Sequence, residues 1–409
     1  MSTSISVGPR ARCAAAGLAL AALAVGCATP PPPVRAGQSP GYAASAWATL
    51  HRDSRNSDFA PLFATPALRV AWAALEGAAM WVGPSLGPEG HVYATSGRGE
   101  GTSHLHAFDR DGNLLWESAP MRSLADLDYG AVINAPLVAD DGDVYQADVD
   151  QLWAFDANGA VRWVASLRDA GAQGHFVTPI FSKEGHVGGI TTDGKVLFFA
   201  RADGALVWPA FDLPGVGGPP ATPAPPGLLE GGLHAREFVQ PMWNLIFGRE
   251  IEVANTPSVH PETGRIFITA GGASPSEGAL YGIDTTPEGP VVAFAHPMAQ
   301  GSGTSPAISP DGALVYAAGD DGVMVAVDAA TGALVWRAED TAAAASPSVG
   351  GDGVVYSTTR GQGLVAIDGR TGARRFAVDF TPLAERVLAE SPERGPRVAS
   401  VNSILTVTD

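Results

Sequence analysis

The run Ala326-Val-Asp-Ala-Ala-Thr-Gly-Ala-Leu-Val-Trp336 decides the fold. An alternating apolar stretch reaches an Asp, turns at Thr-Gly and enters a second alternating stretch that an aromatic residue closes. Alternation with a period of two is typical of a strand, and the turn pair supplies the positive φ that a tight hairpin needs. Comparable runs end at Trp116, Trp163, Trp208 and Phe376. Each run therefore predicts a β-hairpin with an aromatic residue on its second strand.

A second pair of strands precedes each hairpin. Segments such as Pro306 to Tyr316 and Pro347 to Tyr356 combine a short apolar strand, an acidic-Gly turn and a strand that bears an aromatic residue. The closing aromatic residues fall at 72, 116, 163, 208, about 294, 336 and 376, with one long step between 208 and 294. A four-stranded unit that recurs every 40 residues or so is typical of a β-propeller blade. We predict an all-β propeller of about seven blades (six to eight), with six complete blades and a partial seventh.

The two ends of a propeller chain have to meet in one blade. We expect the C-terminal stretch Val401 to Thr408 to pair with the N-terminal strand around Val70 to Trp72, because this pairing leaves neither strand as a bare sheet edge. The residues after Ala399 are enough for two strands at most. The last blade is therefore expected to be thin.

The repeat resembles a known motif. Ala-x-Asp-x-x-Thr-Gly-x-x-x-Trp is similar to the tryptophan-docking repeat of the pyrroloquinoline-quinone-type β-propellers, over roughly Leu68 to Asp379, and the entry segment Trp47 to Asn56 also resembles that family. The resemblance implies that each indole stacks on the peptide near the Gly of the adjacent blade's turn, which buries a large ring between two sheets. It says little about function, because propellers host many activities.

The N-terminus has the pattern of an export signal. Arg10 and Arg12 precede an apolar run that is too short to cross a bilayer as a mature helix, and the run ends in Leu23-Ala-Val-Gly-Cys27, which resembles the lipobox of bacterial lipoproteins. We predict a signal peptide over 1–26, lipid attachment at Cys27, a Pro-rich tether over 27–60 and the propeller over 61–409. Cleavage without lipidation is the alternative. The expected location is the outer membrane or the periplasmic face of the cell envelope.

The segment 209–254 interrupts the repeat and is predicted to be an insertion. Its first half is rich in Pro and Gly and reads as a surface loop, whereas its second half holds an apolar cluster. This cluster is a candidate partner surface, and a cap over blade edges is the alternative. Its aromatic members are Phe238, Trp243 and Phe247.

Composition and charge exclude several classes of protein. The formal charge is 25 − 42 = −17, which repels nucleic acid, so we expect no nucleic-acid partner. Once the leader is removed and Cys27 is acylated, no thiol remains for a disulfide, a metal or a nucleophile. His104 and His106 alternate on one strand as a metal pair could, but His106 aligns with packing positions of the other blades. We predict no metal site and assign no catalytic residue.

Polar residues stand just before the predicted inner strands, with Trp81 in the corresponding place of the first blade, and they should border one mouth of the central channel. Their simplest role is to bond strand-end backbone groups, and ligand binding at the mouth is the alternative. The candidate binding residues are Trp81, Asn134, Thr178, Asn255, Thr304 and Ser346, accompanied by Thr256 and Ser305.

The resemblance implies two contrasting functions. The quinoprotein dehydrogenases of the family hold the quinone and a calcium ion at the centre of the disk and act on alcohols or sugars, but this chain lacks adjacent cysteines and a Cys-x-x-Cys-His haem site. The chain is also similar to the propeller lipoprotein of the machinery that inserts outer-membrane barrels, which keeps the repeat without the cofactor. We therefore predict a non-catalytic envelope scaffold that binds a protein partner, without a cofactor. A periplasmic dehydrogenase with pyrroloquinoline quinone and calcium is the alternative.

Overall fold

The computed structural model describes most of the chain between residues 39 and 408. The residues outside the description in this interval are 64–66, 68, 79, 81, 98–102, 122–130, 132–133, 218–252, 254, 275, 300–303, 320, 340, 342–345, 360–362 and 391–404. Several predicted features lie outside the described residues. These are the signal peptide, Cys27, the first part of the tether, Trp81 and the aromatic cluster Phe238, Trp243 and Phe247.

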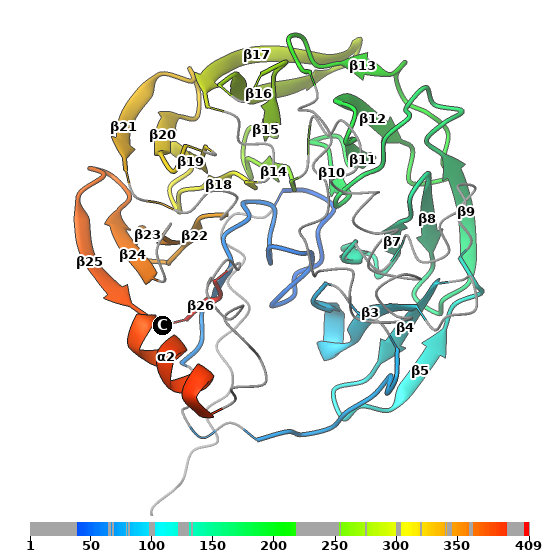
Figure 1. Cartoon of the computed structure of the whole chain (residues 1–409). Helices are drawn as coiled ribbons and strands as arrows, with labels where there is room; N and C mark the ends of the chain where they lie inside the picture. The colour runs from blue at the N-terminus through cyan, green and yellow to red at the C-terminus, as the bar shows by residue number, and fades with distance from the viewer. Residues whose placement is uncertain are drawn as a thin grey trace, which may run out of the picture. The chain divides into compact units, whose positions relative to one another are not determined.

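Six four-stranded antiparallel sheets follow one another around a ring (Figure 1), and we number them blade 1 to blade 6. Within each blade the strands are hydrogen-bonded in chain order, so each blade is a simple meander. The propeller prediction is confirmed. Blades 1 to 3 consist of β2 (Ser85–Leu86), β3 (Val92–Gly97), β4 (Ser103–Phe108) and β5 (Leu114–Glu117); β6 (Leu137–Val138), β7 (Val144–Ala147), β8 (Gln151–Phe155) and β9 (Val161–Ser166); and β10 (Ile180–Phe181), β11 (Val187–Ile190), β12 (Lys195–Phe199) and β13 (Phe211–Asp212).

The second half of the ring repeats this plan and ends in a helix. Blades 4 to 6 consist of β14 (Ser258–Val259), β15 (Ile266–Gly271), β16 (Gly278–Thr286) and β17 (Gly289–Met298); β18 (Ala307–Ile308), β19 (Leu314–Ala318), β20 (Met324–Asp328) and β21 (Leu334–Ala338); and β22 (Ser348–Val349), β23 (Val354–Thr358), β24 (Gly363–Asp368) and β25 (Arg374–Asp379). A short 3-10 helix, η1 (Pro88–Gly90), lies in blade 1, and α2 (Thr381–Glu390) follows β25. Among the described residues, no helix is long and apolar enough to cross a membrane.

Adjacent blades cover both faces of the second strand of a sheet, which explains its composition. Every residue of β15 is buried, as is every residue of β7. Outer strands are mostly exposed instead: in β21 only Trp336 is buried, because this residue packs on the next blade. In five blades the register between the third and the fourth strand shifts by one residue at a β-bulge. Next to this bulge the closing aromatic residue lies opposite an Ala or Gly, as Trp336 lies opposite Ala326. The small first residue of the repeat therefore leaves room for the ring.

The closing aromatic residues other than Phe376 dock on the next blade, as the resemblance implies. The Trp336 indole lies under Gly372, where an added Cβ would be 2.8 Å from the ring, and its Nε1 donates a hydrogen bond of 2.8 Å to the carbonyl of Gly369. Gly372 also has φ +73, so the turn needs glycine both for this backbone conformation and for the space that the ring takes. Trp72, Trp116, Trp163 and Trp208 donate in the same way to carbonyls of the following turns.

The ends of the ring close differently from the prediction. The two-stranded pair consists of β1 (Phe59–Ala60) and β26 (Val407–Thr408), which run parallel. Residues 70–72 form no strand, although Trp72 docks on Gly112 of blade 1. The expected pairing of the C-terminal strand with Val70 to Trp72 is therefore wrong, because β1, just before residue 61, pairs with the C-terminal strand instead.

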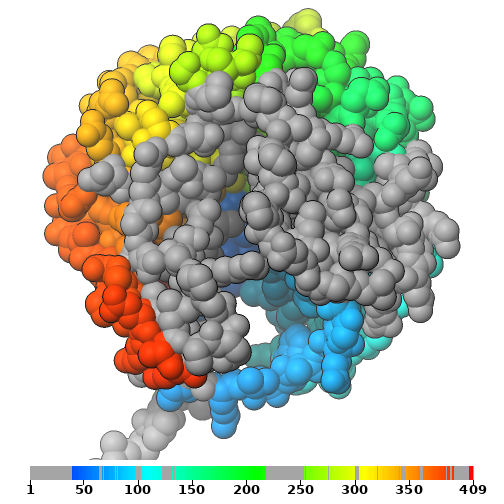
Figure 2. All heavy atoms as spheres, viewed as in Figure 1, coloured from blue at the N-terminus to red at the C-terminus, as the bar shows by residue number. Residues whose placement is uncertain are grey.

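Residues 39–60, which we call the inner strap, belong to the folded body. The sequence predicts that they belong to the tether, but the structure buries most of them at the centre of the ring. They are drawn in blue in Figure 1, and part of this segment is visible in dark blue at the centre of Figure 2. Carbonyls of the strap accept main-chain hydrogen bonds from the inner strands of five blades. The donors are the amides of Leu86, Val138, Val259, Ile308 and Val349. The short inner strands leave these N–H groups free, and the strap satisfies them.

Candidate functional site

The predicted channel-mouth residues that the structure describes lie two or three positions before their inner strands and are all buried. Their hydrogen bonds form a chain across four blades. The Thr256 hydroxyl donates to the Thr178 hydroxyl at 3.2 Å, the Thr256 amide donates to the Ser305 hydroxyl at 3.0 Å, and the Ser305 amide donates to the Ser346 hydroxyl at 3.0 Å. These residues therefore fasten one inner strand to the next.

The three remaining mouth residues, Asn255, Thr304 and Asn134, differ in how well their polar groups are hydrogen-bonded. Asn255 Nδ2 donates to the carbonyl of Thr269 at 2.8 Å, and the Thr304 carbonyl accepts a bond from the Thr269 hydroxyl at 2.7 Å. Asn134 is fully buried, and neither atom of its side-chain amide has a hydrogen-bond partner among the residues that the structure describes. A buried amide without partners is costly. Asn134 is therefore the mouth residue with the greatest remaining capacity to bond a ligand or water.

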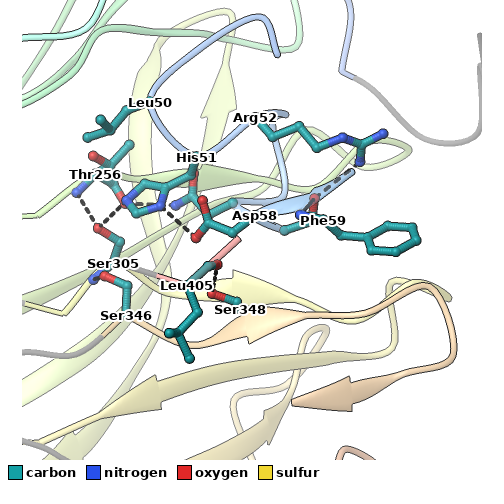
Figure 3. Close-up of polar contacts among 12 residues, drawn as sticks. Leu50, His51, Arg52, Asp58, Phe59, Thr256, Ser305, Ser346, Ser348 and Leu405 are labelled. Carbon is teal, nitrogen blue, oxygen red and sulfur yellow. Dashed lines mark hydrogen bonds and ion pairs between the residues drawn. The ribbon is translucent and has the colours of Figure 1, made fainter. Parts of the chain in front are cut away.

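A charge-assisted chain of side chains stands beside this mouth (Figure 3). Asp58 Oδ2 lies 2.9 Å from His51 Nδ1, and His51 Nε2 lies 3.1 Å from Ser305 Oγ. His51 and Asp58 belong to the inner strap, whereas Ser305 precedes β18 of blade 5. The carboxylate fixes the tautomer in which Nδ1 donates to Asp58 and Nε2 accepts from the Ser305 hydroxyl. Burial raises the pKa of Asp58 and the nearby His51 partly opposes that rise.

These distances match the order Asp, His, Ser of a hydrolase triad, but the surroundings of the serine differ from those of a nucleophile. Ser305 is 4% exposed, and its hydroxyl already accepts a hydrogen bond from the Thr256 amide. The Ser305 amide, which could stabilise an oxyanion, is bonded to Ser346. A serine nucleophile needs access for the substrate and preorganised donors that are free to bind the oxyanion. The arrangement instead joins the inner strap to blade 5.

Other strap residues support the same function. Asn56 Nδ2 donates to the carbonyls of Thr256 and Pro306 at 2.9 and 3.0 Å, which ties the strap to blades 4 and 5 together. Asp53 accepts from Arg52 at 2.8 Å, and both are buried. Arg52, Asn56 and Asp58 have positive φ values of 77, 54 and 51. Such backbone costs free energy and persists where the surrounding contacts determine it.

The sequence could not reveal this site. His51 and Asp58 lie in an irregular segment without strand or helix period, and Ser305 is 254 residues from His51. The one available signal was the resemblance of the entry segment to its family, which gives no pairing.

The described carboxylates at the centre of the ring are already paired with cationic or imidazole groups. Calcium binds six to eight oxygen ligands, among them carboxylates. Asp53 is paired with Arg52 and Arg55, and Asp58 with His51. Within the described part of the chain, no group of three or more His, Cys, Asp or Glu residues could hold a metal ion. The inner strap also places its own backbone against the inner strands.

His104 and His106, which alternate on β4, share one acidic neighbour. Both lie close to Glu117 on β5, with His104 Nδ1 at 3.4 Å and His106 Nδ1 at 3.3 Å from its carboxylate oxygens. His106 is 1% exposed, bonds to the Ser96 hydroxyl at 2.7 Å and stacks on Phe108. His106 therefore occupies a packing position, as its alignment with the other blades predicts.

Several solved structures are similar to this chain. BamB from Moraxella catarrhalis is 15% identical with a TM-score of 0.48, and the match covers 72% of this chain and 74% of that one. A europium-containing methanol dehydrogenase is 14% identical, with a TM-score of 0.42 and coverage of 81% and 85%. The quinohemoprotein alcohol dehydrogenase from Comamonas testosteroni is 14% identical, with a TM-score of 0.41 and coverage of 85% and 74%.

Sequence comparisons give a family. No curated protein matches the chain. The family model described as outer membrane protein assembly factor BamB matches residues 71–223 and 274–399, which is more than half of the chain. The match contains every blade except the first two strands of blade 4, β14 and β15. The chain therefore belongs to the family of the outer membrane protein assembly factor BamB.

Proposed function

We propose that this protein is a non-catalytic scaffold of the cell envelope, held to a membrane by a lipid on Cys27, which binds a protein partner in the assembly of outer-membrane proteins. The observation that carries the proposal is the inner strap. It bonds to inner strands of five blades and occupies the centre of the ring with the chain's own residues. A propeller whose centre is packed in this way offers its loops and outer surfaces for binding.

The family description supports the assembly role, and the leader with its lipobox supports the location. The candidate partner surface remains the cluster Phe238, Trp243 and Phe247 in the insertion 209–254, since an insertion outside the blade plan is free to diverge. In this proposal the mouth residues Thr178, Thr304 and Ser346 join neighbouring blades, as their hydrogen bonds suggest. Asn255 bonds within its own blade, and Asn134 keeps its side-chain amide for a ligand or water.

The first test addresses the dehydrogenase alternative. The purified protein is titrated with pyrroloquinoline quinone and Ca²⁺, with a quinoprotein dehydrogenase as positive control. We expect no stoichiometric change in quinone absorbance and no dye reduction with a panel of alcohols and sugars. A saturable 1:1 chromophore with substrate-dependent dye reduction would overturn the scaffold proposal.

The second test addresses the partner and the anchor. A triple variant, Phe238→Ser, Trp243→Ser and Phe247→Ser, is compared in envelope extracts with Leu114→Ser, Leu115→Ser, which changes two half-exposed residues of β5. We expect a defined partner that co-purifies with the wild type and the β5 variant and is lost from the triple variant. Radiolabelled palmitate should enter the wild type but not Cys27→Ala. Failure to recover any defined partner would contradict the proposal.

A further inference from the structure

The chain contains one Asn-Gly pair, Asn158-Gly159, in the turn between β8 and β9 of blade 2. Asn158 is exposed, and glycine has no Cβ to shield its own amide nitrogen. In such a pair that nitrogen can lose its proton and bond to the side-chain carbonyl carbon of the asparagine, which releases ammonia and closes a five-membered succinimide. Water then opens the ring at either carbonyl and leaves aspartate or isoaspartate. The change needs no oxidant and no enzyme, so the shape of the turn governs its rate.

Hydrogen bonds of the turn hold the reacting nitrogen in place. The Gly159 amide donates to the carbonyl of Asp156 at 2.9 Å. The Asp156 side chain accepts hydrogen bonds from the amides of Asn158 at 2.8 Å and of Ala160 at 2.9 Å. Attack on the Asn158 side chain requires a Gly159 nitrogen that has left its acceptor and rotated towards that side chain. The folded turn therefore opposes the reaction.

Blade 1 fixes this turn from outside. The Trp116 indole of β5 donates from Nε1 to the carbonyl of Ala157 at 3.0 Å. Its ring lies against Gly159, where an added Cβ would be 2.5 Å from the nearest ring atom, and Gly159 has φ +82. The residues on both sides of Asn158 are thus held by one side chain of the neighbouring blade. The conformation of the Asn158 turn therefore depends on the docking of blade 1 on blade 2.

We propose that Asn158 is a deamidation site under the control of the contact between blades 1 and 2, in which docked Trp116 preserves the asparagine and loss of the contact admits succinimide formation. The inference does not depend on the proposed scaffold function. Isoaspartate adds one carbon to the main chain between Ala157 and Gly159, and it adds a negative charge beside Asp156. The lengthened turn no longer presents the Ala157 carbonyl and Gly159 together to the indole. Deamidation therefore hinders the two blades from docking again and leaves a chemical record of an opened contact.

The test measures deamidation of Asn158 in the purified full chain by peptide mass spectrometry, as a mass gain of about 1 Da, with isoaspartate separated from aspartate by chromatography. Wild type is compared in the same mildly alkaline buffer with Trp116→Ala and with Trp336→Ala, which removes the equivalent ring from the contact between blades 5 and 6. We expect Trp116→Ala to deamidate at least about tenfold faster than wild type, because local opening of the turn frees the Gly159 amide. Trp336→Ala should stay within about threefold of wild type, because it leaves this turn docked.

Urea-denatured wild type gives the rate of the unprotected pair, and we expect the folded protein to be at least about tenfold slower. Trp116→Phe, which keeps a ring but loses the Nε1 donor, should lie between folded and denatured wild type, and it serves if Trp116→Ala does not fold. Equal rates in folded and denatured wild type would overturn the proposal, since the turn would then protect nothing. Trp116 variants that deamidate as slowly as wild type, or no faster than Trp336→Ala, would also overturn it, because the contact between blades 1 and 2 would then not control the site.

Discussion

The strap can be released by one substitution at its buried hydrogen-bonded pair, His51 and Asp58. His51 is 1% exposed and Asp58 is 0% exposed, so His51→Ala leaves a buried carboxylate without its partner and also removes the bond to Ser305. Removing one member of a buried pair costs about 3 to 5 kcal/mol. Releasing the strap would in addition free the amides of Val259, Ile308 and Val349 that bond to it.

Those three amides are the reporters in a hydrogen-exchange assay. A loss of about 3 to 5 kcal/mol corresponds to exchange that is roughly 10²- to 10⁴-fold faster. Ile268, which lies inside the paired strand β15, serves as an internal control. His91→Ala, a change of a half-buried histidine at the start of blade 1, should leave strap exchange within about threefold of wild type.

The pH dependence follows from Asp58. Burial raises the pKa of this carboxyl in the folded state, so the folded protein holds a proton that the unfolded chain releases above its ordinary pKa of 3.8. Stability in the variant should therefore fall as pH rises from about 4, by at most about 1.4 kcal/mol per unit, and the strap should be tightest in acid. If His51→Ala lowers the free energy of unfolding by less than about 1 kcal/mol, and this cost does not vary between pH 4 and 8, then the pair of His51 and Asp58 does not hold the strap.

Three further predictions follow from docking, burial and access. Trp336→Ala should cost about 3 to 5 kcal/mol in urea unfolding, and Phe376→Ala less than about 1, because only Trp336 is covered by a neighbouring blade; equal costs would contradict the docking geometry. Burial raises the pKa of Asp148 to about 7, so the stability of the wild type should fall as the pH rises from about 4 to 7. Asp148→Asn should remove up to about 4 kcal/mol of that fall. An unchanged slope of stability against pH would show that Asp148 ionises freely. A fluorophosphonate probe should not label the folded protein, because Ser305 is buried; labelling that Ser305→Ala abolishes would establish a reactive serine.

The blade plan could be predicted because each part of it is local. Asp328, Thr331 and Gly332 form a turn whose bonds are all within five residues, with Asp328 Oδ1 accepting the amides of Ala330 and Thr331. The docking of Trp336 on Gly372 spans one repeat, so the period shows it. The polar residues before the inner strands were also visible from their repeated position.

The strap and the closure could not be predicted, because they depend on contacts without a period. Residues 39–60 have the Pro-poor, polar composition of a linker, and their partners are carbonyl and amide groups that any sequence has. Asp58 looks like a solvent-exposed carboxylate until the structure places it against His51. The wrong pairing of residues 70–72 has the same origin, since strand propensity at Val70 says nothing about which segment reaches the C-terminal strand first.

Ring closure connects these features physically. Propeller rings are usually closed by the docking of the last blade on the first, but among the described residues Phe376 of blade 6 is half-exposed. The strap supplies a different closure, since five main-chain hydrogen bonds at about 1 kcal/mol each tie five blades to one segment. The segment must then adopt the positive φ values of Arg52, Asn56 and Asp58 to turn from blade to blade. The same segment therefore both ties the blades together and occupies the centre of the ring.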